Sequence, residues 1–324
     1  MSMVEISFEH LEKPAHQVIG FIIKAIEKNV QHQRWLMLLH HHSSVDANTM
    51  PQHPEALHDF RVELRRLRVW LVQSRGCVAT RRAARTQLRR LAKLSNAPRD
   101  REVFLDLLAK TQPALPRHEP RDSAPCAHPN TQKPTNTRTL IQALAARLPK
   151  LAPRRRKQKP QAFGLWLAQR LKEAQHQSEV CFNGNETCLH KARIHIKHLR
   201  YLIEPLAALP IMTAAISHLK SLQTTLGDLH DLYLMRQLIA PWVCTQLNGQ
   251  LSELISQPMV KKNQIQQAFN PARDEFIRAI HWQTTQYQAA LNQWDEQAAS
   301  HRQTLETNLR AVIDVLTAQG KPDS

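Results

Sequence analysis

One short pattern of basic and apolar residues occurs twice in this chain of 324 residues, and it constrains the fold more than any other feature. The first copy covers residues 58–68, HDFRVELRRLR, and the second covers residues 190–200, HKARIHIKHLR. The copies lie 132 positions apart and share a histidine, an arginine three residues later and a final Leu-Arg pair. A pattern that recurs at a fixed offset predicts two copies of one structural unit.

Each copy is predicted to form a helix with one basic face. At 100° per residue, positions 0, 3, 7 and 10 of a copy share a stripe about 80° wide. Like charges on one helix face repel each other, so an anionic partner is the simplest source of compensating energy. The predicted core positions of the two helices are Leu64, Leu67, Ile196 and Leu199. The two basic stripes comprise His58, Arg61, Arg65 and Arg68, matched by His190, Arg193, Lys197 and Arg200.

The composition favours a helical, strongly basic protein. There are 44 Lys and Arg against 27 Asp and Glu, a net charge of +17, which argues for a polyanionic partner such as nucleic acid, polyphosphate or an acidic membrane surface. Only seven glycines occur, and helix-forming residues are abundant. Five cysteines without a Cys-x-x-Cys pair, no signal-peptide layout and no apolar run of about 18 residues predict a cytoplasmic protein without a membrane span.

Hydrophobic periodicity divides the chain into two similar halves. Residues 112–138 contain six prolines and are expected to be a loop or insert, followed by a short helix at 139–149 and a basic linker. The other helices are expected at 15–39, 55–75, 77–96, from 99 onward, 161–182, 187–209, 211–226, 228–247 and 271–317.

The repeated plan predicts an all-α fold in which two four-helix bundles are related by a pseudo-twofold axis. We expect a single domain at 5–310, with an N-terminal bundle at 14–111 and a C-terminal bundle at 161–257. The insert and linker at 112–160 join the bundles, and additional helices at 270–318 follow them.

These motifs resemble those of the CHAD family, whose name stands for conserved histidine α-helical domain. The resemblance covers about residues 5–310 and rests on the two His-x-x-Arg helices, on Arg200-Tyr201-x-x-Glu204 and on Leu222-Gln223-x-x-Leu226-Gly227-x-x-x-Asp231. It implies two pseudo-symmetric helical bundles with a basic central cleft that binds inorganic polyphosphate. Family members are often fused to a CYTH-type triphosphatase domain. No Glu-x-Glu-x-Lys strand occurs here, so a stand-alone member is expected.

The candidate polyphosphate-binding residues combine the two stripes with cations on their flanks and on the following helices and turns. An arginine fork binds phosphate oxygens bidentately, lysine supplies a compact charge, and histidine binds more strongly when protonated. Arg66 and His198 lie on the flank opposite the final arginines, so a position at the cleft edge and one in solvent both stay open. The complete predicted set is His58, Arg61, Arg65, Arg66, Arg68, Arg89, Arg90, Lys93, Arg99, His190, Arg193, Lys197, His198, Arg200, Lys220 and His230.

The sequence favours binding over catalysis. It contains no P-loop, no nucleophile elbow and no acidic cluster for Mg²⁺, so no enzymatic activity is expected. No His or Cys set has ligand spacing with supporting carboxylates, so neither a metal nor another cofactor is expected. We therefore predict non-enzymatic polyphosphate binding, with targeting to polyphosphate granules or their organisation as a further expectation.

Two alternatives remain open. The first is nucleic-acid binding through the same basic surface, but aromatic residues make up only 5% of the chain and none lies within the basic stripes. The second, weaker alternative is a polyphosphate-metabolising enzyme.

Overall fold

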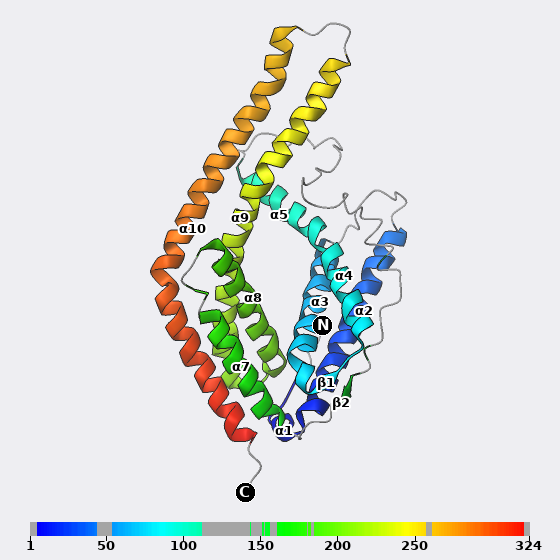
Figure 1. Cartoon of the computed structure of the whole chain (residues 1–324), viewed down its shortest axis with the longest axis vertical. Helices are drawn as coiled ribbons and strands as arrows, with labels where there is room; N and C mark the ends of the chain where they lie inside the picture. The colour runs from blue at the N-terminus through cyan, green and yellow to red at the C-terminus, as the bar shows by residue number, and fades with distance from the viewer. Residues whose placement is uncertain are drawn as a thin grey trace. The chain divides into compact units, whose positions relative to one another are not determined.

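The computed structural model describes residues 5–43, 54–111, 143, 151, 153–155, 161–179, 181–182, 185–256 and 261–320. These residues are almost entirely helical, which confirms the all-α class (Figure 1). Two short strands, β1 (Val78–Ala79) and β2 (Arg154–Arg155), pair antiparallel. The predicted insert at 112–138 lies outside the described residues, as does nearly all of the helix expected at 139–149.

The first half of the chain follows the predicted order of helices. The first motif copy lies in α3, which is followed by the 3₁₀ turn η1 (Ser74–Gly76). The next helix starts later than expected because β1 occupies two of its predicted residues. The helices are α1 (Glu9–Glu12), α2 (Ala15–Ser43), α3 (Pro54–Gln73), α4 (Arg82–Leu94) and α5 (Asn96–Lys110).

The second half differs from prediction in one helix. The separate helices expected at 211–226 and 228–247 are wrong, since one helix spans both. Gly227 lies inside this helix, and the described glycines include none with positive φ. Its propensity cost of about 1 kcal/mol is outweighed by leucines buried on either side. The elements are α7 (Phe163–Glu179), α8 (Glu186–Ile203), η2 (Glu204–Leu206), α9 (Pro210–Ile255) and α10 (Lys262–Gln319).

The chain divides into two compact units that do not coincide with the two sequence halves. The first unit comprises Met1–Asn96, Thr137–Gly227 and Asp295–Ser324, and the second comprises Ala97–Asn136 and Asp228–Trp294. Both motif helices, α3 and α8, therefore belong to the first unit. The expected pseudo-twofold relation between two four-helix bundles stays a prediction.

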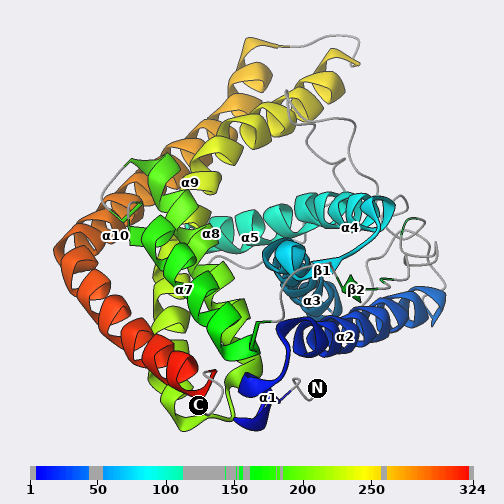
Figure 2. The same ribbon diagram turned by 60° about the horizontal axis from the view of Figure 1, so that its bottom comes forward.

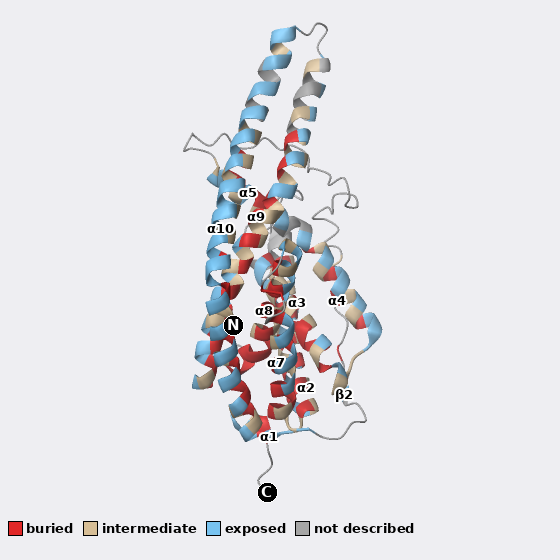
Figure 3. Cartoon of the chain, turned by 60° about the vertical axis from the view of Figure 1, so that its left-hand side comes forward, coloured by how far each residue is buried: buried red, intermediate tan, exposed pale blue. Residues whose placement is uncertain are grey.

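The core of the first unit lies among α2, α3, α7 and α8, which pack against one another. The rings of Trp70, Phe163 and Trp166 stack with centroids 5.8 to 6.5 Å apart. The last part of α10 adds a buried face, visible as repeated red positions along an otherwise exposed helix (Figure 3). All four predicted core positions of the motif helices are buried, which confirms that part of the helical pattern: Leu64, Leu67, Ile196 and Leu199.

Two glycines allow the end of α10 to lie directly against α7. A Cβ atom on Gly164 would come 2.6 Å from the backbone oxygen of Leu316 and 3.4 Å from the Cα of Gly320. It would also lie 3.4 Å from the backbone oxygen of Leu11 in α1. The first and last helices of the chain therefore contact the same turn of α7 (Figure 2).

The second unit has its own apolar core. Phe104 and Leu108 of α5 pack with Met235 and Ile239 of α9 and with Ala279 of α10. None of the described helices contains the extended apolar stretch that a bilayer crossing requires.

Candidate functional site

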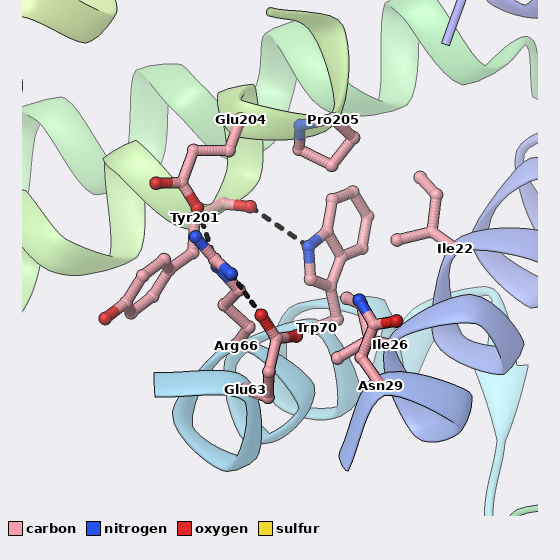
Figure 4. Close-up of a pocket in the computed structure, with 9 residues that line it drawn as sticks. All are labelled: Ile22, Ile26, Asn29, Glu63, Arg66, Trp70, Tyr201, Glu204 and Pro205. Carbon is pink, nitrogen blue, oxygen red and sulfur yellow. Dashed lines mark hydrogen bonds and ion pairs between the residues drawn. The ribbon is translucent and has the colours of Figure 1, made fainter. Parts of the chain in front are cut away.

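The two copies of the motif lie on helices that contact each other. α3 packs against α8, and the Trp70 indole Nε1 of α3 donates a hydrogen bond of 3.0 Å to the backbone oxygen of Tyr201 on α8 (Figure 4). Trp70 is fully buried, so this bond is shielded from water. The packing therefore brings matched segments of both sequence halves together inside one compact unit.

A buried ion cluster of Glu63, Arg66, Arg200 and Glu204 connects these helices. The Arg66 Nε lies 2.9 Å from the Glu204 carboxylate, and Arg66 also pairs with Glu63 on its own helix (Figure 4). The Arg200 Nε lies 3.1 Å from the other Glu204 oxygen. Both guanidinium groups lie over the Tyr201 ring, at 5.8 and 5.0 Å from its centroid. Two cations and two carboxylates make this cluster neutral.

The electrostatics of Arg66 follow from these contacts. Burial acts to lower the pKa of Arg66, but Glu204 and Glu63 together raise it above its ordinary value. The guanidinium is thus directed at two carboxylates, and together with them it lines a small pocket (Figure 4). Direct phosphate binding by Arg66 and Arg200 stays a prediction, while their contacts give them a role in joining α3 to α8.

Arg61, a member of the first basic stripe, binds the end of α4. Its guanidinium donates to the backbone oxygens of Ser95 and Asn96 and to the Asn96 side-chain oxygen. Ser95 directly follows α4 and Asn96 is the first residue of α5, so this cation binds the junction between the two helices. Arg61 therefore fixes the end of α4 relative to α3.

Three arginines on α3 and α4 form a basic cluster of Arg65, Arg68 and Arg89. Among the described residues, none of the three has an ion-pair partner. Burial lowers the pKa of Arg68, and repulsion from Arg89 and Arg65 lowers it further. Arg68 is therefore close enough to both other arginines to be repelled by them, and none of the described carboxylates forms an ion pair with the three side chains.

Histidines of the second motif copy lie close to these and other cations. Burial, followed by the neighbouring His195 and Arg68, lowers the pKa of His198 to about 4. Burial and two cations of the second stripe, Arg193 and Lys197, likewise lower the pKa of His190. Since Arg68 lies on α3 and His198 on α8, residues of the two copies are close enough to interact electrostatically.

α4 extends the basic surface. The helix carries five cations and no acidic residue. Its buried side is formed by Ala84, Leu88 and Leu91, and most of its cations are exposed. The predicted residues Arg89, Arg90 and Lys93 are among these exposed cations, and Lys220 is exposed on α9.

The other predicted residues are placed as follows. His58 and His190 are exposed, Arg193 is half-buried and Lys197 is buried, and each makes further interactions within the chain. Arg99 and His230 belong to the second compact unit, where the His230 ring lies near Tyr233. The side chain of Arg99 lies outside the described residues.

Sequence reasoning missed Glu63, Glu204 and His195 as parts of this region. A signal existed for Glu204, because Arg200 and Glu204 are four residues apart on one helical face. His195 carried no such signal, since it lies outside the repeated stripe. No group of three or more potential metal ligands occurs in the part of the chain that the structure describes.

The fold and the site define an all-α protein in which the two helices that carry the basic motif pack against each other and a cluster of arginines lies on α3 and α4. The family model of the CHAD domain matches residues 36–240, and the chain belongs to this family. A search of curated protein sequences returns no match. Among solved structures, the chain resembles the crystal structure of the CHAD domain from the plant Ricinus communis, with a TM-score of 0.50 and 15% identity over 90% of this chain and 95% of that one. This likeness shows a shared fold.

Proposed function

We propose that this protein binds inorganic polyphosphate and does not transform it chemically. CHAD domains are associated with polyphosphate binding in general. The observation that carries the proposal is the basic cluster of Arg65, Arg68 and Arg89, which lacks ion-pair partners within the described residues and faces His198 of the second copy. Phosphate groups would relieve this repulsion and accept forked hydrogen bonds from the arginines.

The basic residues suit a linear polyanion better than a single phosphate. The exposed cations of α4 from Arg82 to Lys93 extend over about 16 Å at 1.5 Å per residue. A chain of phosphates can contact several such positions at once and release a counterion at each, by analogy with nucleic acids. The affinity should therefore decrease steeply as salt is added.

The carboxylates of the region argue against phosphoryl transfer. Mg²⁺ is usually held by one or two carboxylates together with substrate phosphates. Glu63 and Glu204 are buried and already engaged by Arg66 and Arg200. We assign these four residues, with Arg61, to positioning the helices, and the basic cluster to direct phosphate contact.

Replacement of Arg65, Arg68 and Arg89 by alanine tests the proposal. We expect the affinity for long-chain polyphosphate to fall at least about 100-fold, with a shallower salt dependence, because three phosphate contacts are lost. The matched control replaces Arg273, Arg278 and Arg310 of α10, which removes the same net charge elsewhere. Equal losses in both variants would mean that bulk charge alone is responsible, and the proposed site would be wrong.

Two further measurements separate the alternatives. Duplex DNA of equal total charge should compete for the protein only at much higher concentration than polyphosphate; equal competition at moderate salt would favour nucleic-acid binding. Release of orthophosphate from polyphosphate in the presence of Mg²⁺ or Mn²⁺ would instead establish an enzyme.

We further propose that the protein associates with polyphosphate granules. A fluorescent fusion should colocalise with granules, and the variant lacking the basic cluster should not. If this variant still colocalises with granules, the basic cluster is not what causes granule association.

A further inference from the structure

Two histidines of α8, His195 and His198, lie one helical turn apart, and His198 lies near Arg68 of the basic cluster. Their ring centroids are 6.2 Å apart and the rings are nearly perpendicular, at 85°. The Nδ1 atom of His195 is buried and has no hydrogen-bond partner among the described groups. The Nε2 atom is therefore the ring nitrogen that is able to meet a ligand.

We infer that His195 and His198 form a proton-accepting part of the phosphate site, so that the protein takes up protons when polyphosphate binds. This inference rests on the proposed function and adds His195 to the residues that recognise the ligand. It predicts that polyphosphate binding is coupled to pH, which an array of arginines and lysines alone would not produce near neutral pH.

The surroundings of the two rings disfavour their charged forms in the free protein. His198 faces Arg68 of α3 and His195 of its own helix, and His195 faces Lys191. Arg68 in turn lies near Arg65 of α3 and Arg89 of α4. None of these neighbours is a carboxylate. Burial and this positive field lower the pKa of both histidines, that of His198 to about 4.

A bound phosphate chain would make the electrostatic potential at the two histidines negative instead of positive. An anion near a histidine favours the charged imidazolium, which can donate to a phosphate oxygen from its accessible nitrogen. The pKa of each ring then rises, and the ring takes its proton from the solvent. Where one proton is taken up, the affinity increases about tenfold for each unit by which the pH falls between the bound and free pKa values.

Calorimetric titration of the full-length protein with long-chain inorganic polyphosphate measures this uptake. Titrations at pH 6 in two buffers of different ionisation enthalpy give the number of protons bound, because the buffer supplies them. We expect an uptake of about one proton or more for the wild-type protein, since burial and neighbouring cations disfavour the protonated form of both rings before binding. His190 contributes to this total because it also lies among cations.

The variant H195Q/H198Q isolates the contribution of the pair, and we expect it to lose at least half of the uptake. The matched control is H218Q/H301Q, which removes a second histidine pair with centroids 5.6 Å apart on α9 and α10. This control should keep the wild-type uptake. Circular dichroism verifies that each variant retains its helical content.

The possible outcomes separate the inference from the proposed function. A binding enthalpy of the wild-type protein that does not depend on the buffer, with binding intact, would overturn the proton coupling and leave polyphosphate binding in place. An unchanged uptake in H195Q/H198Q would show that other groups bind the protons. The absence of any polyphosphate binding at pH 6 and pH 7 would refute the proposed function itself, and the coupling with it.

Discussion

Replacement of Glu204 by glutamine removes the charge that two arginines share at the contact between α3 and α8. The Glu204 side chain is only 6% exposed, and those of Arg66 and Arg200 are 19% and 14% exposed. Loss of one partner from a buried ion pair costs about 3–5 kcal/mol because the remaining charge stays buried without compensation. Arg66 retains Glu63, so we expect Glu204→Gln to lower the free energy of unfolding by about 2–3 kcal/mol.

Urea unfolding followed by circular dichroism measures this change. The control is Glu306→Gln, whose partner Arg310 lies four residues away on the exposed face of α10. The side chains of this pair are 48% and 70% exposed, so its loss should cost no more than about 0.5 kcal/mol. If Glu204→Gln proves no more destabilising than Glu306→Gln, the buried ion cluster does not hold the two helices together.

Three further predictions concern stability and are tested by the same urea measurement. Gly227→Ala should stabilise the protein by about 0.5–1 kcal/mol, because the site is helical and open; Gly164→Ala should destabilise it by about 1–3 kcal/mol, because its Cβ would meet a backbone oxygen. If Gly164→Ala proved more stable than Gly227→Ala, the close packing described at Gly164 of α7 would be refuted. Trp70→Phe should cost about 1–2 kcal/mol through the lost hydrogen bond to Tyr201, and an unchanged stability would contradict it. The folded pKa of His198 lies below its unfolded value, so the stabilising effect of its neutral form is complete above about pH 6.5 and is lost as the pH falls toward 4. Between pH 7 and pH 4, the free energy of unfolding should therefore decrease by about 2–3 kcal/mol less in His198→Gln than in the wild-type protein. Equal decreases would show that His198 does not titrate this way.

The sequence was informative wherever local periodicity decides the outcome. The all-α class, the two motif helices and buried positions such as Leu64 and Ile196 follow from spacing along the chain, and the structure confirms them. The division at Gly227 was wrong because a local propensity was given more weight than burial along the whole helix. A single glycine costs too little to end a helix that buries leucines on both sides of it.

The distant partners of Arg61 and Arg66 could not be read from the sequence. Arg66 pairs with a carboxylate 138 positions away, and Arg61 binds backbone oxygens 34 and 35 positions away. Both residues look like ordinary members of a basic run, since helical spacing shows which way a side chain points and not what it meets. Arg68 looks the same in sequence, and only its neighbours in space, Arg65 and Arg89, distinguish it as a cation that no described carboxylate pairs with.

The contact of α1 and the end of α10 with the same turn of α7 gives the chain a closed connectivity. If either α1 or the end of α10 detaches, it exposes the backbone at Gly164 that the other element also contacts. Local unfolding of α1 should therefore favour local unfolding of the end of α10, although the two segments lie some 300 residues apart in sequence.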